Sequence, residues 1–469
     1  MIYLVCILGY LLLLGVIAVW KSRDVKDQSD FAVAGRSLSP WMMVCTMLAV
    51  WIGTGSIVGN AEQTYETGMA AMLLPISTLV GMALLALIAT RARNIEASTV
   101  PEIIERRFGA VARNVAMISL VFAYMVIVSY QFNAGGAVLE VIVGDKQILT
   151  AQTATLIAAV FIISYAALAG LMSLAWMDLV TGSIIMLTMV ITLPIYWFKA
   201  GGWSGIEAGF IADDRASHMQ LWGVYTPTQL INFTLPVFLL ILGDANQYQR
   251  IFASRSARGA RTAVTMLVFI AFAVELLIIT CAWIASSMTP DPENGKYILI
   301  YAARHYLAIP LGCLFMVTVV AIIISTADSF LHVPATSVVN DLYLPYIHPN
   351  ASQKQIVRMS RLFVVAFGVI AYAVTWMFSE STGFFEKALW AFTIYGACIT
   401  PSLVAALIWE RATKLGAIAS MCTGAIVILA WKLAAELLHQ KVPAAIADLD
   451  AVLPAITLSV TMLIVVSLM

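Results

Sequence analysis

Charged side chains are scarce in this chain. Only 11% of its 469 residues are Asp, Glu, Lys or Arg, whereas 61% are hydrophobic. Soluble domains carry about 25% charged residues, so this composition excludes a soluble globular protein. The chain also lacks the ten-residue segments of alternating polarity that are typical of a transmembrane β-barrel. We therefore expect an integral membrane protein built entirely of helices.

Several other signals are missing. The six cysteines are scattered singly through apolar segments without any CxxC pair, so we expect neither disulfides nor a cysteine metal site. The net charge of zero gives no indication of a nucleic-acid partner. No nucleophile–base or metal-ligand group stands out, and no polar region is long enough to house a catalytic domain. We expect a protein that is not an enzyme and has no organic cofactor.

Long apolar runs dominate what remains. At roughly twenty apolar residues per crossing, the sequence predicts about thirteen transmembrane helices. Residues 2–20 lack a basic stretch before them and a clear cleavage site, and we interpret them as the first span rather than as a secretory signal. The predicted spans are 2–20, 40–60, 70–90, 114–141, 150–168, 175–198, 228–247, 263–287, 310–333, 359–379, 387–409, 415–437 and 451–469.

Basic residues favour one orientation of these spans. With the N-terminus outside, most of the 26 Lys and Arg residues fall on the cytoplasmic side, as expected from the positive-inside rule. An odd number of spans then places the C-terminus in the cytoplasm. We expect a multi-pass protein of the plasma membrane.

Two of the predicted spans contain helix-breaking residues. The second span carries Gly53, Gly55 and Gly59 at mid-membrane, and the seventh carries Pro236 followed by polar residues up to Arg250. Spaced glycines also serve close helix packing, which is the alternative interpretation. The two segments are five spans apart, and interrupted helices in corresponding positions of two halves indicate a midplane binding site in secondary transporters.

A third span is interrupted by polar residues rather than by glycine. Residues 321–343 are strongly apolar except for a central polar group, in which Ile322, Ser325, Thr326 and Ser329 share one helical face. Hydroxyl and carbonyl oxygens suit a small hard cation. The alternative is that each hydroxyl bonds back to the carbonyl four residues earlier.

Four segments carry a family resemblance: AVWIGTGSIVGNAEQ, YAALAGLMSLAWMD, NQYQR, and ISTADS with DLY behind it. Together they resemble the sodium:solute symporter family, nearest to its choline and proline-like bacterial branches. Leu171 and Met177 stand where the family signature has a glycine and a threonine. The resemblance implies a leucine-transporter-type fold, which is a five-plus-five inverted repeat whose first helix is broken in each half.

The resemblance also implies a division of the chain. The expected parts are an extra helix and cytoplasmic loop at 1–36, a first repeat at 37–200, an extracellular loop at 201–226, a second repeat at 227–412, and extra helices at 413–469.

A principal sodium site follows from the same resemblance. Its ligands would be the carbonyls of Ala49, Ile52 and Ile322 together with the hydroxyls of Ser325 and Thr326. The chemistry agrees independently, because a helix broken after Ile52 frees carbonyls that would otherwise accept hydrogen bonds within it.

A second sodium site is less clear. Similar members use an aspartate at the position of Asp178, with residues that match Ser325, Asp328 and Ser329. The alternatives are that Asp178 caps the N-terminus of its helix and that Asp328 belongs to a polar network.

The solute is expected between the two broken helices. Trp51 invites a cation–π interaction with an amine, although it could equally be a packing residue. Asp244 stands where choline transporters have an aromatic residue, and it could supply a counter-charge or stabilise the inner gate. Glu275, alone in the eighth span, is interpreted as a structural hydrogen-bonding residue. The candidate solute-binding residues are Trp51, Gly53, Thr54, Ser56, Gln63, Tyr124, Gln131 and Asp244.

These observations predict a sodium-coupled symporter that imports a small polar organic solute, such as proline or another amino acid, or an amine, by alternating access. Its partners would be the solute, sodium ions and membrane lipid, and it would function as a monomer. The alternatives are proton coupling on the same fold, and a transporter-like sensor or channel.

Overall fold

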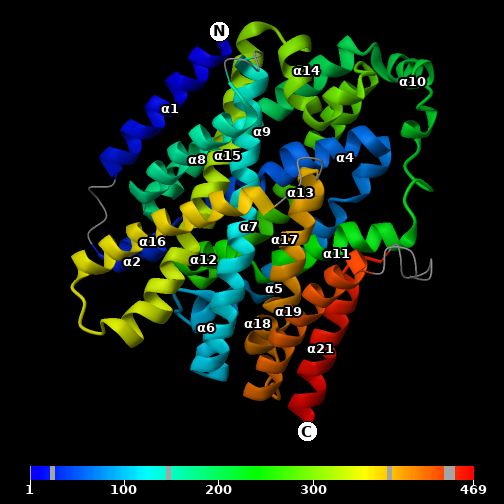
Figure 1. Ribbon diagram of the computed structural model, residues 1–469. Coiled ribbons are helices and arrows are strands. Elements are labelled where there is room, and N and C mark those ends of the chain that lie inside the picture. The colour runs from blue at the N-terminus through cyan, green and yellow to red at the C-terminus, as the bar shows by residue number, and fades with distance from the viewer. Residues whose placement is uncertain (1, 22–26, 144–148, 169, 378–382, 438–448) are drawn as a thin grey trace.

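The computed structural model describes residues 2–21, 27–143, 149–168, 170–377, 383–437 and 449–469. These residues form helices joined by short connections, with the two termini at opposite ends of the molecule (Figure 1). Among them the only extended pairing is an isolated bridge between Leu38 and Ser254. The prediction of an all-helical protein is confirmed.

Most of the body consists of long helices. Within the described residues, nine helices are long and apolar enough to cross a membrane, or up to eleven if each of two bent pairs is one span. The predicted number of about thirteen would need α1 and α21 as well, and it stays a prediction. The unbroken long helices are α1 (Ile2–Lys21), α5 (Ile76–Asn94), α7 (Ala110–Val143), α8 (Ala151–Leu168), α9 (Leu171–Lys199), α13 (Ala257–Ser287), α15 (Ile309–Val338), α16 (Gln353–Val374), α19 (Lys414–Leu437) and α21 (Val452–Leu468).

Both predicted breaks are present. The first divides α3 (Pro40–Trp51) from η3 (Gly55–Gly59), α4 (Asn60–Thr67) and η4 (Gly68–Leu73), with a bend of 56°. The second divides α11 (Pro227–Gly243) from α12 (Ala245–Ala253) at the single residue Asp244. A third break, between α17 (Phe384–Cys398) and α18 (Thr400–Ile408), bends the chain by 41° and was not predicted.

Shorter helices connect these elements. Arg304 and His305 lie on one of them, directly before α15. The connecting helices are α2 (Gln28–Val33), η2 (Ala34–Arg36), α6 (Val100–Phe108), α10 (Gly202–Ala212), η5 (Ala216–Met219), η6 (Pro292–Tyr297), α14 (Ile298–Tyr306), η7 (Val339–Ile347) and η8 (Thr375–Met377).

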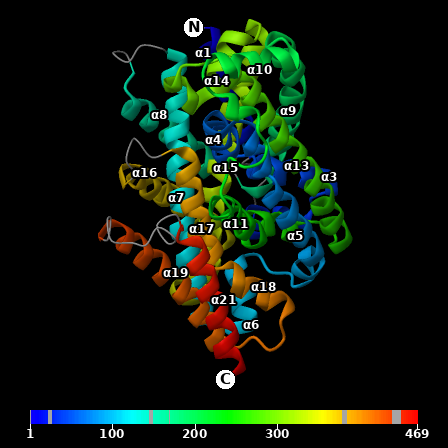
Figure 2. The ribbon, with the colours of Figure 1, turned by 90° about the vertical axis from the view of Figure 1, so that its right-hand side faces the viewer.

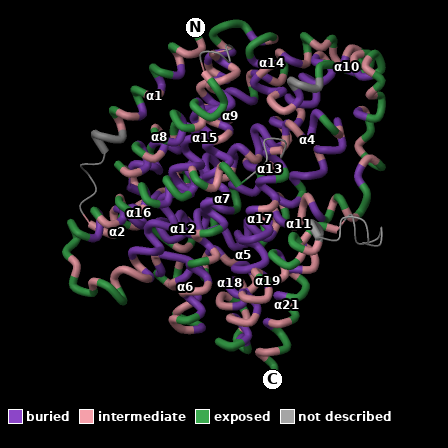
Figure 3. Tube along the Cα trace, in the orientation of Figure 1, coloured by how far each residue is buried: buried purple, intermediate pink, exposed green. Residues whose placement is uncertain are grey.

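Helix α15 forms the centre of the molecule. Its span is 72% buried, whereas those of α8 and α19 are 28% buried. It packs against α3, α7, α9 and α16, and buried residues surround it (Figure 3). Helices α19 and α21 lie against each other at one side of the body (Figure 2). The interrupted apolar helix of the sequence is therefore the central one.

Glycines allow two close helix contacts near the centre. A Cβ at Gly182 of α9 would lie 2.8 Å from the carbonyl oxygen of Cys45 in α3. A Cβ at Gly59 would lie 3.1 Å from the backbone of Phe385 in α17. The packing interpretation therefore applies to Gly59, although the glycine-rich segment also contains the break.

The segment before α3 is tied to the segment after α12 by backbone hydrogen bonds. Leu38 N–H donates to the Ala253 carbonyl at 3.0 Å, and Arg255 N–H donates to the Leu38 carbonyl at 3.2 Å. The entry to the first broken helix and the exit from the second are thus joined directly.

Candidate functional site

The break in α3 diverts backbone donors from their helical carbonyl partners. Ile52 N–H still donates to the Leu48 carbonyl at 2.8 Å, but Gly53 N–H turns back to the Trp51 carbonyl at 2.9 Å. In an unbroken helix Gly53 would instead pair with Ala49. The Ala49 carbonyl accepts a hydrogen bond from the Ser325 hydroxyl at 3.4 Å.

The facing surface of α15 supplies hydroxyl groups that do not bond back to their own helix. Ser325 Oγ donates to Asp178 Oδ1 at 2.5 Å, beside its longer contact with Ala49. Thr318, two turns earlier on α15, does bond back, to the Leu314 carbonyl at 2.8 Å. The back-bonding alternative is therefore wrong for Ser325.

Thr326 lies directly against the break. A Cβ at Gly53 would lie 3.1 Å from Thr326 Oγ1. Within the part of the chain that is described, this hydroxyl is buried without a hydrogen-bond partner, so it does not bond back to Ile322 either. Ala49, Ile52, Ile322, Ser325 and Thr326 are all buried.

Asp178 is not a helix cap. Helix α9 begins at Leu171 with Gly170 as its N-cap, so Asp178 lies well inside the helix. Its carboxylate accepts hydrogen bonds from Ser325 and from Thr46 Oγ1, the latter at 2.5 Å. The capping alternative is wrong because the helix starts two turns earlier than the motif suggested.

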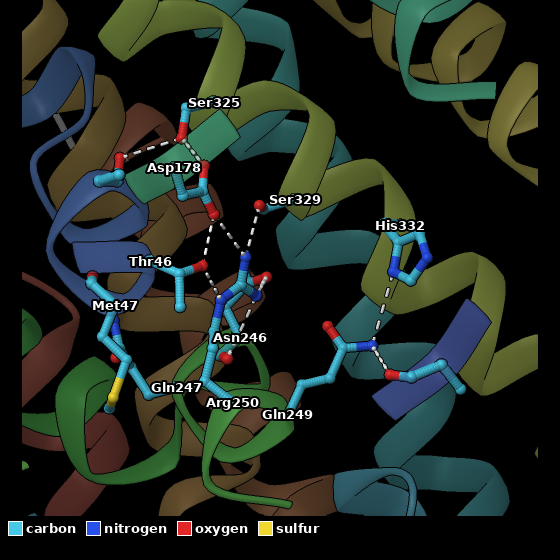
Figure 4. Close-up of polar contacts among 12 residues, drawn as sticks. Thr46, Met47, Asp178, Asn246, Gln247, Gln249, Arg250, Ser325, Ser329 and His332 are labelled. Carbon is cyan, nitrogen blue, oxygen red and sulfur yellow. Dashed lines mark hydrogen bonds and ion pairs between the residues drawn. The ribbon is translucent and has the colours of Figure 1, made fainter. Parts of the chain in front are cut away.

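Arg250 of α12 reaches into the same cluster (Figure 4). Its Nη2 lies 3.5 Å from Asp178 Oδ2 and donates to Ser329 Oγ at 2.7 Å, and its Nε donates to Thr46 Oγ1 at 3.2 Å. Asp178 and Ser329, two of the predicted ligands of a second sodium, are thus both bound to a guanidinium group. Asp328 is 2% exposed, and among the described residues its Oδ1 has no hydrogen-bond partner.

A small cavity of about 50 Å³ lies next to the break. It brings together four of the predicted solute-binding residues, which are Trp51, Gly53, Ser56 and Gln131. Behind the cavity, Thr54 Oγ1 donates to the side-chain Oε1 of Gln131. The Gln131 amide nitrogen is buried and, among the described residues, unpartnered.

Besides Thr54, three predicted residues do not line this cavity. Tyr124 donates to Asp244 Oδ1 at 2.5 Å, at the break between α11 and α12. Asp244 also caps α12 by accepting from Asn246 N–H at 3.1 Å. Gln63 donates to the Tyr225 hydroxyl at 3.4 Å. Tyr124 and Asp244 therefore support the break between α11 and α12, and they do not line the cavity beside the break in α3.

The sequence interpretation undervalued other cavity residues. Glu275 of α13 lines the cavity and accepts a hydrogen bond from Trp51 Nε1 at 2.8 Å. An ionisable residue in a membrane span was the available signal, but its neighbours come from distant segments. The lining residues outside the predicted solute and sodium sites are Val50, Gly55, Asn60, Tyr130, Val237, Leu240, Glu275, Phe330, Phe385, Ala388, Leu389 and Phe392.

Known proteins resemble the chain over nearly its whole length. A high-affinity proline transporter of Bacillus subtilis (strain 168) is 26% identical over 466 residues, covering 94% of each protein. A sodium/glucose cotransporter of Vibrio parahaemolyticus is 23% identical, covering 89% of this chain and 81% of the relative.

A solved structure also matches the fold. The substrate-bound, outward-open state of a sodium-coupled sialic acid symporter superimposes with a TM-score of 0.82 at 15% identity, covering 100% of this chain and 98% of that one. This confirms the predicted leucine-transporter-type fold.

The model of the sodium:solute symporter family matches residues 31–424, which include both broken helices, Asp178 and the polar centre of α15. The chain therefore belongs to the sodium:solute symporter family and is a sodium-coupled solute symporter rather than an enzyme.

Proposed function

We propose that this symporter imports a small organic solute that carries an amino group, such as proline or a related amine, with one sodium ion bound beside the solute. The supporting observation is that the Thr326 hydroxyl, against the break at Gly53, has no hydrogen-bond partner among the described residues. The hydroxyl and the broken helix form one wall of the cavity that would hold the solute.

The sodium ligands would be those predicted from the sequence. The carbonyls of Ala49, Ile52 and Ile322 and the hydroxyls of Ser325 and Thr326 offer five oxygen donors without a fixed charge of their own. Asp178, 2.5 Å from Ser325 Oγ, would add its negative charge from behind the hydroxyl. A monovalent cation suits such a donor set.

A second sodium at Asp178, Ser325, Asp328 and Ser329 would have to displace Arg250. The guanidinium group already supplies a positive charge between Asp178 and Ser329. We therefore propose one coupling sodium, with Arg250 and its partners acting as a polar network that holds α12 against α9 and α15.

One sodium ion supplies enough energy for accumulation. Its entry gains about 2.3 kcal/mol from a potential of 100 mV and about 1.4 kcal/mol from a tenfold concentration gradient. Together these amount to about 3.7 kcal/mol, which sustains a solute ratio of a few hundred.

The solute class rests on the cavity and the relatives. The unpartnered Gln131 amide nitrogen is a donor suited to a carboxylate, and Trp51 offers an aromatic face to a cationic group. The Bacillus subtilis relative is named as a proline transporter. The cavity of about 50 Å³ has room for only a few water molecules, so the solute would enter a more open state of the alternating-access cycle.

The protein would act as a monomer in the plasma membrane, with its N-terminus outside and its C-terminus in the cytoplasm. The division into repeats at 37–200 and 227–412, flanked by the segments 1–36, 201–226 and 413–469, is proposed on the same grounds. The two breaks fall early in the two proposed repeats.

A thermal-shift screen of amino acids, amines, sugars and carboxylates, run in sodium and again in potassium, tests this function. A ligand that binds only the folded state raises the melting temperature. We expect an amino acid or amine to stabilise the protein in sodium alone. Stabilisation that follows pH and is independent of sodium would instead support proton coupling.

A further inference from the structure

Glu275 is a buried carboxylate at the wall of the solute cavity. It lies near the middle of α13, and the residue is only 3% exposed. Trp51 Nε1 donates to its Oε1 at 2.8 Å, and Thr78 of α5 supplies another side-chain hydrogen bond. Both donors are neutral groups, so they satisfy lone pairs without balancing a charge.

Within the described part of the chain, no ion pair involves Glu275. Arg106, Arg113, Arg215 and Arg250 form ion pairs with other acidic residues. Burial of a carboxylate without a counter-charge is costly. A cationic ligand in the cavity would remove that cost.

Aromatic rings line the same cavity and complete the chemistry. Trp51, Tyr130, Phe330, Phe385 and Phe392 all contribute to its wall. Rings attract a positively charged nitrogen through their faces and pack against the carbon atoms attached to it. A carboxylate set among aromatic rings therefore suits a compact organic cation, because the carboxylate balances the charge and the rings contact the carbon atoms.

Asp244, the other carboxylate considered for this role, is differently placed. It does not line the cavity, and it already holds the Tyr124 hydroxyl and caps α12. The counter-charge role therefore moves from Asp244 to Glu275.

We propose that Glu275 determines solute specificity by binding the positively charged nitrogen of an amino acid or amine, and that Trp51 is a positioning residue that orients the Glu275 carboxylate. This inference rests on the proposed function. It adds to that function the residue that distinguishes cationic from neutral solutes.

Paired probes that differ only in the charged nitrogen test the proposal. L-proline is compared with tetrahydrofuran-2-carboxylate, in which oxygen replaces the nitrogen, and choline with 3,3-dimethylbutan-1-ol, in which carbon replaces it. Binding is measured by thermal shift on the purified full chain in sodium. In at least one pair, the wild type should bind the member with the positively charged nitrogen roughly ten- to a hundredfold more tightly than the member without it, as expected for a hydrogen bond to a charged group.

Glu275→Gln should abolish that preference, because the amide keeps the size and an acceptor oxygen but loses the charge. Glu275→Asp is the charge-conserving control and should retain a preference. Trp51→Phe keeps an aromatic face but removes the indole donor, so it should weaken cation binding less than Glu275→Gln does. Sodium-induced stabilisation without solute should persist in all three variants and shows that each is folded.

Two results would overturn the proposal while leaving sodium coupling intact. One is a Glu275→Gln variant that still prefers the cationic probes, and the other is a wild type that sodium stabilises but that binds neither cationic probe. Absence of any sodium effect on the wild type would instead contradict the proposed function itself.

Discussion

Arg250 Nη2 lies 3.5 Å from Asp178 Oδ2, and both side chains are almost completely buried. The pair joins α12 to α9 and, through Ser329 and Ser325, to α15. A guanidinium group behind the predicted sodium ligands sets the local charge before any ion binds. In this polar network, Asp178 and Arg250 each balance the buried charge of the other.

This dependence predicts a specific pattern of stability. Asp178→Asn or Arg250→Gln alone leaves one buried charge unpaired, and each should lower the free energy of unfolding by about 3–5 kcal/mol. The double variant removes both charges and should lose less than the two single losses together. Unfolding in detergent measures all three variants, and strictly additive losses would argue against a coupled pair.

The sodium ligands can be tested on α15 itself. Ser325→Ala combined with Thr326→Ala removes two proposed oxygen ligands, so the sodium concentration for half-maximal stabilisation or uptake should rise at least about tenfold. Thr318→Ala is the matched control, since this hydroxyl bonds back to Leu314 and contacts Thr188 away from the break. Unchanged sodium dependence in the double variant would show that the Ser325 and Thr326 hydroxyls are not sodium ligands.

Asp244 should affect the transport rate rather than the choice of solute. Asp244→Asn weakens the hydrogen bonds that hold Tyr124 and the start of α12, so a change in uptake rate with solute affinity kept within about twofold is expected. Tyr124→Phe removes the hydroxyl that donates to Asp244, so it should likewise change the uptake rate and leave the solute affinity nearly unchanged. A large loss of affinity confined to Asp244→Asn would restore its role as a counter-charge.

Gly59 should tolerate no added methyl group. A Cβ there meets the backbone of Phe385 at 3.1 Å, and backbone yields less readily than a side chain. Gly59→Ala is expected to cost about 1–3 kcal/mol of stability. Gly9→Ala on α1, where a Cβ would meet nothing within 4 Å, is the control and should be neutral or slightly stabilising.

His218, on η5 outside the spans, predicts a pH effect. Burial lowers the pKa of His218, and its Nε2 donates to the Tyr65 carbonyl at 3.0 Å. The imidazole of His218 is therefore protonated more readily in the unfolded chain than in the folded protein. The contribution of neutral His218 to stability is complete above the unfolded pKa of about 6.5 and is lost as pH falls below that value. His218→Gln removes the titration, so the melting temperature of the wild type relative to this variant should fall between pH 7.5 and pH 5. A constant difference would contradict this origin.

Local patterns were sufficient to predict the main architecture. The breaks at Ile52–Gly53 and Asp244 follow from glycine, proline and polar residues within apolar runs, and Ser325 and Thr326 follow from their spacing on one helix. The bend at Ile399 was not predicted, although Pro401 lies within the predicted span 387–409 and is the same kind of signal as Pro236.

Partners from distant segments could not be predicted. Glu275 meets Trp51 across 224 positions of sequence, and nothing local distinguishes this carboxylate from a structural one. Asp178 was placed at a helix start because the motif ends there, whereas α9 begins at Leu171. Arg250 was noted only as the end of a motif, yet its side chain organises the whole polar centre.

The backbone bonds of Leu38 to Ala253 and Arg255 have a mechanical consequence. They couple the start of α3 to the end of α12, so a tilt of α12 would be transmitted to α3 through the backbone itself. When the protein changes conformation, either the start of α3 and the end of α12 move together, or the two backbone hydrogen bonds must break before the two segments can separate.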